Sequence, residues 1–100
     1  MRGIVYCSNF ENGIQKLEQI IQDYEIMGIT YELYNYRRGI TTCSVEFTNG
    51  DYWKIVHASD SARGNCCNVA YIDRNISTEI VETIIMPTIK AKPYQAYRYY

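Results

Sequence analysis

The stretch Asn68-Val69-Ala70-Tyr71-Ile72-Asp73 decides the fold of this chain. It has too few polar positions for a strand with one face in water, which is typical of a central strand in a parallel sheet. The strand ends in a carboxylate. A polar loop over residues 59–67, with the pair Arg63-Gly64, precedes it, and a helix starts after it at Asn75 to Thr78, with Glu79 in the first turn. A loop, a buried strand and a helix in this order predict an α/β fold.

A second strand and helix lie at the N-terminus. Ile4 to Cys7 is a short apolar run that suits a buried strand. Ser8 to Glu11 predicts a capping box, in which the Ser8 hydroxyl accepts from the Glu11 amide. Gly28 then marks the end of a helix from about residue 9 to 27. The apolar side chains of one face of this helix recur at spacings of four, three, four and three: Phe10, Ile14, Leu17, Ile21 and Tyr24.

The middle of the chain predicts three strands. Residues 29–34 alternate between apolar and polar side chains, and residues 40–47 do the same. Asn49-Gly50 predicts a tight hairpin turn with positive φ at both central residues. Residues 52–58 are therefore expected to pair back on residues 40–47 as an antiparallel hairpin.

The whole chain is predicted to be one small α/β domain over residues 1–100. Its elements follow the order β-α-β-β-β-β-α, which gives a mixed sheet with an antiparallel hairpin and two helices. Pro87 is expected to end the second helix. Residues 88–100 show no clear period, and we predict an extended tail there.

Composition excludes several classes of protein. A net charge of −1 gives no overall attraction to nucleic acid or to anionic membranes, although a local basic patch stays open. No apolar run approaches the roughly 20 residues of a membrane helix, and the N-terminus lacks the pattern of a signal peptide. We therefore expect a cytoplasmic protein with reduced cysteines. Four cysteines without a C-x-x-C pattern, and His57 as the one histidine, predict no metal site.

Eleven tyrosines are many for 100 residues, and they cluster at 31–36 and 94–100. Two interpretations stay open. Tyrosine is favoured at interfaces, and it also substitutes for phenylalanine on half-buried strands. Basic residues stand among these tyrosines, so the same segments also suit single-stranded nucleic acid. The candidate interaction surface comprises Arg37, Arg38, Tyr94, Tyr97, Arg98, Tyr99 and Tyr100.

From Ile4 to about Ile89, the order of elements resembles the middle of the ATPase domain of phage terminase large subunits, the DNA-packaging motors. The resemblance implies that Asp73 stands at the position of a magnesium-binding carboxylate, with Arg63 and Gly64 in the turn before it. The matching segments are Val5-Tyr6-Cys7-Ser8-Asn9 with its helix, Phe47-Thr48-Asn49-Gly50, Asp60-Ser61-Ala62-Arg63-Gly64, Val69-Ala70-Tyr71-Ile72-Asp73, and Ile84 to Pro87.

Two departures from that family bear on activity. The chain has no G-x-x-x-x-G-K-S/T phosphate loop. Arg74 stands where the resemblance implies a catalytic glutamate, and a cation cannot accept a proton from water. We therefore expect no catalytic residue and no cofactor. Magnesium and nucleotide are expected to bind only if another chain supplies the phosphate loop, as in a split ATPase. Otherwise Asp73 is expected to cap the turn or the second helix.

Three hypotheses of function follow. The first is a small non-catalytic interaction protein, derived from a phage or prophage, that binds a protein partner and regulates or inhibits it. The second is a nucleic-acid-binding module that uses the Arg37-Arg38 loop and the C-terminal segment. The third is a split or vestigial ATPase subdomain of a packaging motor. An exposed sheet edge would in addition permit a homodimer.

Overall fold

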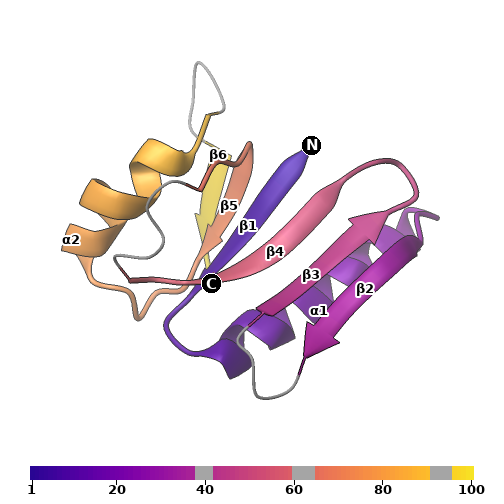
Figure 1. The fold of residues 1–100 in the computed structure, drawn as a ribbon, viewed down its shortest axis with the longest axis horizontal. Helices are drawn as coiled ribbons and strands as arrows, with labels where there is room; N and C mark the ends of the chain where they lie inside the picture. The colour runs from indigo at the N-terminus through magenta and orange to yellow at the C-terminus, as the bar shows by residue number, and fades with distance from the viewer. Residues whose placement is uncertain (38–41, 60–64, 91–95) are drawn as a thin grey trace.

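The computed structural model describes residues 1–37, 42–59, 65–90 and 96–100. The helices and strands are β1 (Arg2–Cys7), α1 (Phe10–Ile26), β2 (Tyr31–Arg37), β3 (Thr42–Phe47), β4 (Tyr52–His57), β5 (Val69–Ile72), α2 (Thr78–Ile80) and β6 (Ala96–Tyr99). After α2 the chain continues as a π-helical turn over Val81–Ile85 and a 3₁₀ turn over Met86–Thr88. These elements confirm the predicted α/β class and the order β-α-β-β-β-β-α (Figure 1).

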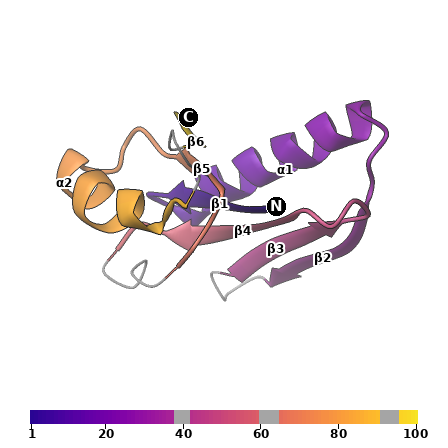
Figure 2. The same ribbon diagram turned by 90° about the horizontal axis from the view of Figure 1, so that it is seen from above.

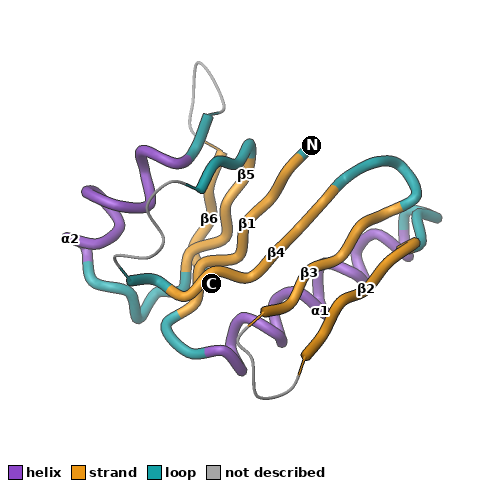
Figure 3. The backbone as a smooth tube through the Cα atoms, in the orientation of Figure 1, coloured by secondary structure: helices purple, strands orange, loops and turns teal. Residues whose placement is uncertain are grey.

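All six strands form one mixed sheet in the order β2-β3-β4-β1-β5-β6. β1 is parallel to both of its neighbours, β4 and β5, and β5 is parallel to β6. β3 is antiparallel to β2 and to β4. The sheet therefore has a parallel half and an antiparallel half that meet at β4, with β2 and β6 at its two edges (Figure 3).

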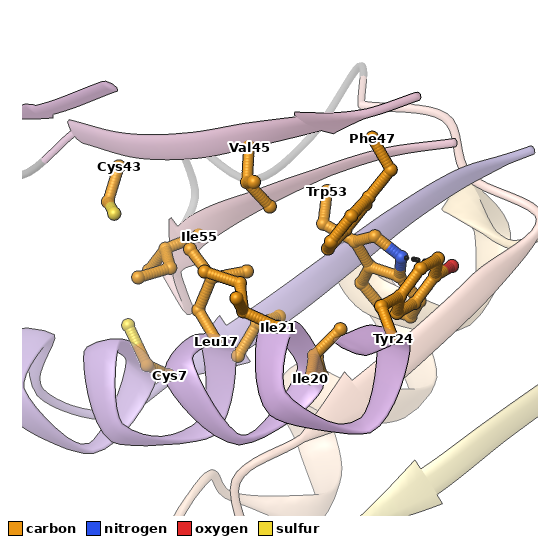
Figure 4. Packing of buried hydrophobic residues seen from close by; sticks show 11 residues of the cluster. Cys7, Leu17, Ile20, Ile21, Tyr24, Cys43, Val45, Phe47, Trp53 and Ile55 are labelled. Atoms are coloured by element: carbon orange, nitrogen blue, oxygen red, sulfur yellow. Dashed lines mark hydrogen bonds between the residues drawn. The ribbon is translucent and has the colours of Figure 1, made fainter. Parts of the chain in front are cut away.

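The helices cover opposite faces of the sheet. α1 lies along the side of β2, β3 and β4, and α2 lies at the other end of the sheet (Figure 2). Under α1 is a buried cluster with Leu17, Phe47 and Trp53 at its centre (Figure 4). Under α2 is a second cluster, which includes Ile72 and Ile85. The sheet thus separates two cores.

β1 is central because its side chains are apolar on both faces. Ile4 and Tyr6 belong to the core under α2, and Val5 and Cys7 belong to the core under α1. A strand that is buried on both faces has a continuous run of apolar residues, and such a run at Ile4 to Cys7 is what predicted a buried strand here. Gly3 pairs with Trp53, and a Cβ atom at this position would overlap the indole ring.

The predicted helix over residues 9–27 is confirmed, but the predicted capping box is wrong. Asn9 is the N-cap, and its Oδ1 accepts from the Asn12 amide at 2.9 Å. Ser8 donates its hydroxyl hydrogen to Asp73 instead. Because Asn9 takes the N-cap position, Ser8 lies one residue before the helix, and its hydroxyl makes a charge-assisted hydrogen bond to the carboxylate. Gly28 follows the helix with φ of 80°, as predicted.

The hairpin of β3 and β4 is confirmed, whereas the predicted turn type is wrong. Only Gly50 has positive φ, at 92°, and Asn49 does not. The Gly50 amide donates to the Phe47 carbonyl at 3.0 Å, and the Phe47 amide donates to the Asp51 carbonyl at 2.9 Å. These bonds describe a turn closed over three residues with glycine in the left-handed position, another common hairpin connection. The Asn49 side chain accepts from the Asp51 amide and supports this turn.

The segment predicted as an extended tail, residues 88–100, contains a sixth strand. Thr88 and Ile89 are buried, and β6 pairs with β5 from Ala96 to Tyr99. The period of β6 is not visible in the sequence because three of its four residues are exposed at the sheet edge.

Candidate functional site

Asp73 follows β5 and is a buried carboxylate with an exposed fraction of 2%. Its Oδ2 accepts from the Ser8 hydroxyl at 2.5 Å, the Ser8 amide at 3.1 Å and the Asn12 side-chain amide at 3.4 Å. Its Oδ1 accepts from the Asn75 amide at 2.9 Å. The carboxyl ends of β1 and β5 meet at this edge of the sheet, and Asp73 connects them to the first turn of α1.

These four donors engage both oxygens of the carboxylate, three at Oδ2 and one at Oδ1. An ionised carboxyl group has about four acceptor positions on its two oxygens. Burial opposes the ionisation of Asp73, but the hydrogen bonds from Ser8, Asn75 and Asn12 outweigh burial and hold the pKa of Asp73 below its ordinary value. Ligation of a metal ion through Oδ2 would require one of its three donors to move away, whereas Oδ1 accepts a single bond.

Stability is expected to decrease at acid pH because of this carboxylate. The folded-state pKa of Asp73 is lowered, so its contribution is complete above about pH 5 and is lost as the pH falls through about 4 and below. Urea unfolding at a series of pH values would measure this loss. The Asp73→Asn variant should lose less stability than the wild type over the same range. The pKa of Asp51 is also lowered, and Asp51 is present in both proteins. An equal loss of stability in the wild type and in Asp73→Asn would therefore mean that Asp73 is not the source of the loss.

A cleft of about 460 Å³ opens beside Asp73. It lies where the connections of two neighbouring strands diverge, since β1 leads into α1 on one face and β5 leads into α2 on the other. Open α/β sheets bind ligands at such points. The lining residues are Asn12, Gln15, Lys16, Gln19, Asp73, Arg74, Asn75 and Tyr100.

Lys16 is the cation inside this cleft. Its Nζ lies 4.2 Å from the ring centroid of Tyr71 and 5.9 Å from that of Tyr100, and it donates to Gln19 Oε1 at 3.0 Å. Burial lowers the pKa of Lys16, and Asp23 acts against this shift. The lining side chains are four carboxamides, two cations, one engaged carboxylate and the phenol of Tyr100, without histidine, serine or cysteine. The cleft therefore offers groups for binding, and its lining contains no serine or cysteine nucleophile beside a histidine base.

The structure separates the residues of the predicted interaction surface. Arg37 ends β2, at one edge of the sheet, and Tyr97, Arg98 and Tyr99 lie on β6, at the other. Five strand spacings put these edges roughly 24 Å apart. Tyr100 is only partly exposed, and its hydroxyl donates to the Tyr6 carbonyl at 3.0 Å. The other predicted residues lie outside the described part of the chain: Arg38, Arg63, Gly64 and Tyr94.

The four cysteines are all free thiols, and Cys7 on β1 pairs with His57 on β4. Cys7, Cys43 and Cys67 are buried free thiols, and Cys66 is exposed. Burial raises the pKa of Cys7 and of Cys67 to about 11, so both are protonated at neutral pH. His57 is exposed, with Nε2 at 3.1 Å from the Ser8 carbonyl. Within residues 1–37, 42–59, 65–90 and 96–100, no group of three or more histidine, cysteine or acidic residues could hold a metal ion.

No family model, no curated protein and no solved structure matches this chain. The resemblance to terminase large subunits therefore rests on the sequence segments quoted above. In the parts of the chain that the structure describes, no helix is long and apolar enough to cross a membrane.

Sequence reasoning missed Ser8, Asn12 and Lys16 as neighbours of Asp73. A signal for the first two was present in the sequence. Parallel strands end at the same edge of a sheet, so the residues that follow Cys7 and Ile72 must lie close together. Nothing in the sequence indicated that Lys16 turns toward Tyr71.

Proposed function

We propose that this chain is a small non-catalytic interaction protein, derived from a phage or prophage, on a degenerate terminase-ATPase-like scaffold. It acts in the host cytoplasm by binding a protein partner and regulating or inhibiting it. Neither a cofactor nor a metal ion takes part.

The state of Asp73 carries this proposal. In an active site of the resembling kind, this carboxylate would be available to magnesium. Here its oxygens accept four hydrogen bonds from the chain itself, and Arg74 follows in place of an acid. These contacts favour a structural role for the carboxylate, and a scaffold without chemistry is consistent with a protein that acts through its surface.

A second candidate function is binding of single-stranded nucleic acid at β6. Tyr97 and Tyr99 are exposed on one face of β6, and their rings meet edge to face with centroids 5.9 Å apart, while Arg98 is exposed on the opposite face. Exposed aromatic rings on which bases can stack are typical of such surfaces. Among the strands that the structure describes, none lies beyond β6, and this edge keeps the split-ATPase alternative open because it could pair with a strand of another chain.

The purified protein is expected to release no phosphate from ATP and magnesium above the level of a buffer blank. The reason is the absence of both a phosphate loop and a free carboxylate in the described site. A phosphate-release assay on the wild type and the Asp73→Asn variant measures this. Steady turnover in the wild type that disappears in Asp73→Asn would refute the proposal, provided that circular dichroism shows the variant to be folded.

A further inference from the structure

We infer that the β2 edge of the sheet, together with the groove between β2 and α1, is the docking surface for an extended basic segment of the partner protein. This inference rests on the proposed function and locates its binding surface. The segment would add a strand to the sheet at β2 and place alternate side chains on the two sides of the edge.

The backbone of β2 offers one free side. β2 pairs with β3 along Tyr31 to Arg37, and no other described strand lies beyond it. The strand at the edge of a sheet presents a row of N–H and C=O groups that another chain can pair with. β2 has seven residues, whereas β6, at the other edge, has four. The β2 edge therefore offers the longer template for pairing.

The groove beside β2 is aromatic and measures about 530 Å³. Ile14 and Glu18 line it from α1, and Tyr31 and Tyr34 line it from β2. The two tyrosine rings meet edge to face with centroids 5.8 Å apart. Such a groove can receive the apolar side chains of a strand that pairs with β2.

Apolar side chains are also exposed at the C-terminal end of α1 and on β2. Ile26 is 85% exposed, Met27 is 63% exposed and Leu33 is 47% exposed. Leu33 pairs with Glu46, whereas Tyr34 pairs with Val45, which is buried under α1. Leu33 therefore lies on the opposite face of the sheet from Tyr34. An added strand would meet an exposed apolar residue on each face, which suits the alternation of its side chains.

The charge around this edge selects the partner. Residues 10–37, from the start of α1 to the end of β2, carry five acidic side chains, one lysine and one arginine, although the net charge of the whole chain is only −1. Glu18, Glu25 and Glu32 are all exposed, and the one lysine, Lys16, faces Tyr71 instead. Glu18 and Glu25 are seven residues apart and so share a face of α1. This acidic surface complements a segment in which lysine or arginine alternates with apolar residues.

The same charges disfavour a second copy of this chain as the occupant. β2 carries one acidic and one basic residue, but pairing it with β2 of another copy in one continuous sheet would place the two α1 helices on the same face, with Glu18 and Glu25 of each side by side. Juxtaposed like charges oppose association. A basic segment of a different protein is the occupant that fits both the groove and its charge.

Fluorescence anisotropy with a labelled peptide of alternating lysine and valine would test this inference, with a glutamate–valine peptide of the same length as its counterpart. The lysine–valine peptide is expected to bind at least about tenfold more tightly than the glutamate–valine peptide, because the acidic side chains of the docking surface repel glutamate. The double variant Glu18→Lys/Glu25→Lys should weaken its binding at least about tenfold. The matched control Glu79→Lys/Glu82→Lys makes the same charge change at exposed positions near α2 and should bind like the wild type.

Amide chemical shifts decide where the peptide binds. Changes concentrated at Tyr31–Arg37 and along α1 support the inference. Changes at Ala96–Tyr99, equal binding of both peptides, or no binding of either would overturn it. Sedimentation of the protein alone tests whether a second copy of the chain occupies the surface. A dimer through β2 would also overturn the inference. ATP turnover is a separate readout: turnover refutes the proposed function, while absent peptide binding without turnover refutes only this docking surface.

Discussion

Replacing Asp73 by alanine is expected to lower the free energy of unfolding by about 3–4 kcal/mol, since a hydrogen bond to a charged group contributes roughly 1.5–3 kcal/mol and such contributions do not add fully. The substitution removes the acceptor of four hydrogen bonds at the junction of β1, β5 and α1. The cleft beside the site would let water reach some of the donors, which keeps the loss below the sum of the separate bonds. Urea denaturation at pH 7 measures the change.

Two comparisons make this result specific. Asp73→Asn keeps the shape of the side chain but replaces one acceptor oxygen with a donor, so we expect an intermediate loss of about 1–2 kcal/mol. Asp23→Ala removes an exposed carboxylate from α1 and should change stability by less than about 0.5 kcal/mol. If Asp73→Ala behaved like Asp23→Ala, the carboxylate would not be the connection between β5 and α1 that the contacts indicate.

Replacing Phe47 by alanine is expected to destabilise the protein by about 3–5 kcal/mol, as for other buried aromatic residues. Phe47 is buried under α1, and its ring stacks on that of Tyr24 with centroids 3.8 Å apart and an angle of 12° between the planes (Figure 4). The Tyr24 hydroxyl accepts from Trp53 Nε1 at 3.1 Å and donates to Asp51 at 2.7 Å. The cavity left by Phe47 would therefore also loosen the ring that orders this chain of hydrogen bonds.

The stability of Phe47→Ala, measured by thermal and urea unfolding, should be compared with that of two control variants. Phe47→Leu keeps most of the apolar volume and is expected to cost less than about 1.5 kcal/mol. Ile26→Ala removes an apolar side chain that is already exposed, and should change stability by less than about 0.5 kcal/mol. A similar loss in Phe47→Ala and Ile26→Ala would mean that Phe47 is not part of the packed core.

Local patterns were sufficient to predict most of the fold. The apolar run at Ile4 to Cys7, the helical period from Phe10 to Tyr24 and the Asn49-Gly50 turn each predict an element that the structure contains. β6 was not predicted, because an edge strand of four residues with exposed tyrosines shows no alternation. Its place in the sheet depends on pairing with β5, which is a tertiary contact that no local pattern encodes.

The candidate site was predictable only in part. Asp73 could be singled out because it ends an apolar strand, and the turn role predicted for it is consistent with its bond to the Asn75 amide. The contacts with Ser8 and Asn12 bring together residues more than 60 positions apart in the chain. They depend on strand order, which the sequence left open. Arg37 and Tyr97, which the sequence analysis grouped, lie on the two outer strands β2 and β6, since distance along the sheet cannot be read from spacing along the chain.

The position of β1 in the middle of the sheet also affects how the chain can fold. β1 precedes both of its neighbours in the sequence and cannot pair until they are available, because Arg2 pairs with Tyr52 and Gly3 pairs with Val69, at separations of 50 and 66 residues. Pairings between distant residues slow folding, since a long loop must close before any contact stabilises it. Until then β1, which is apolar on both faces, stays exposed to aggregation or to chaperones. The hairpin of β3 and β4 has no such delay and is the natural first piece of the sheet to form.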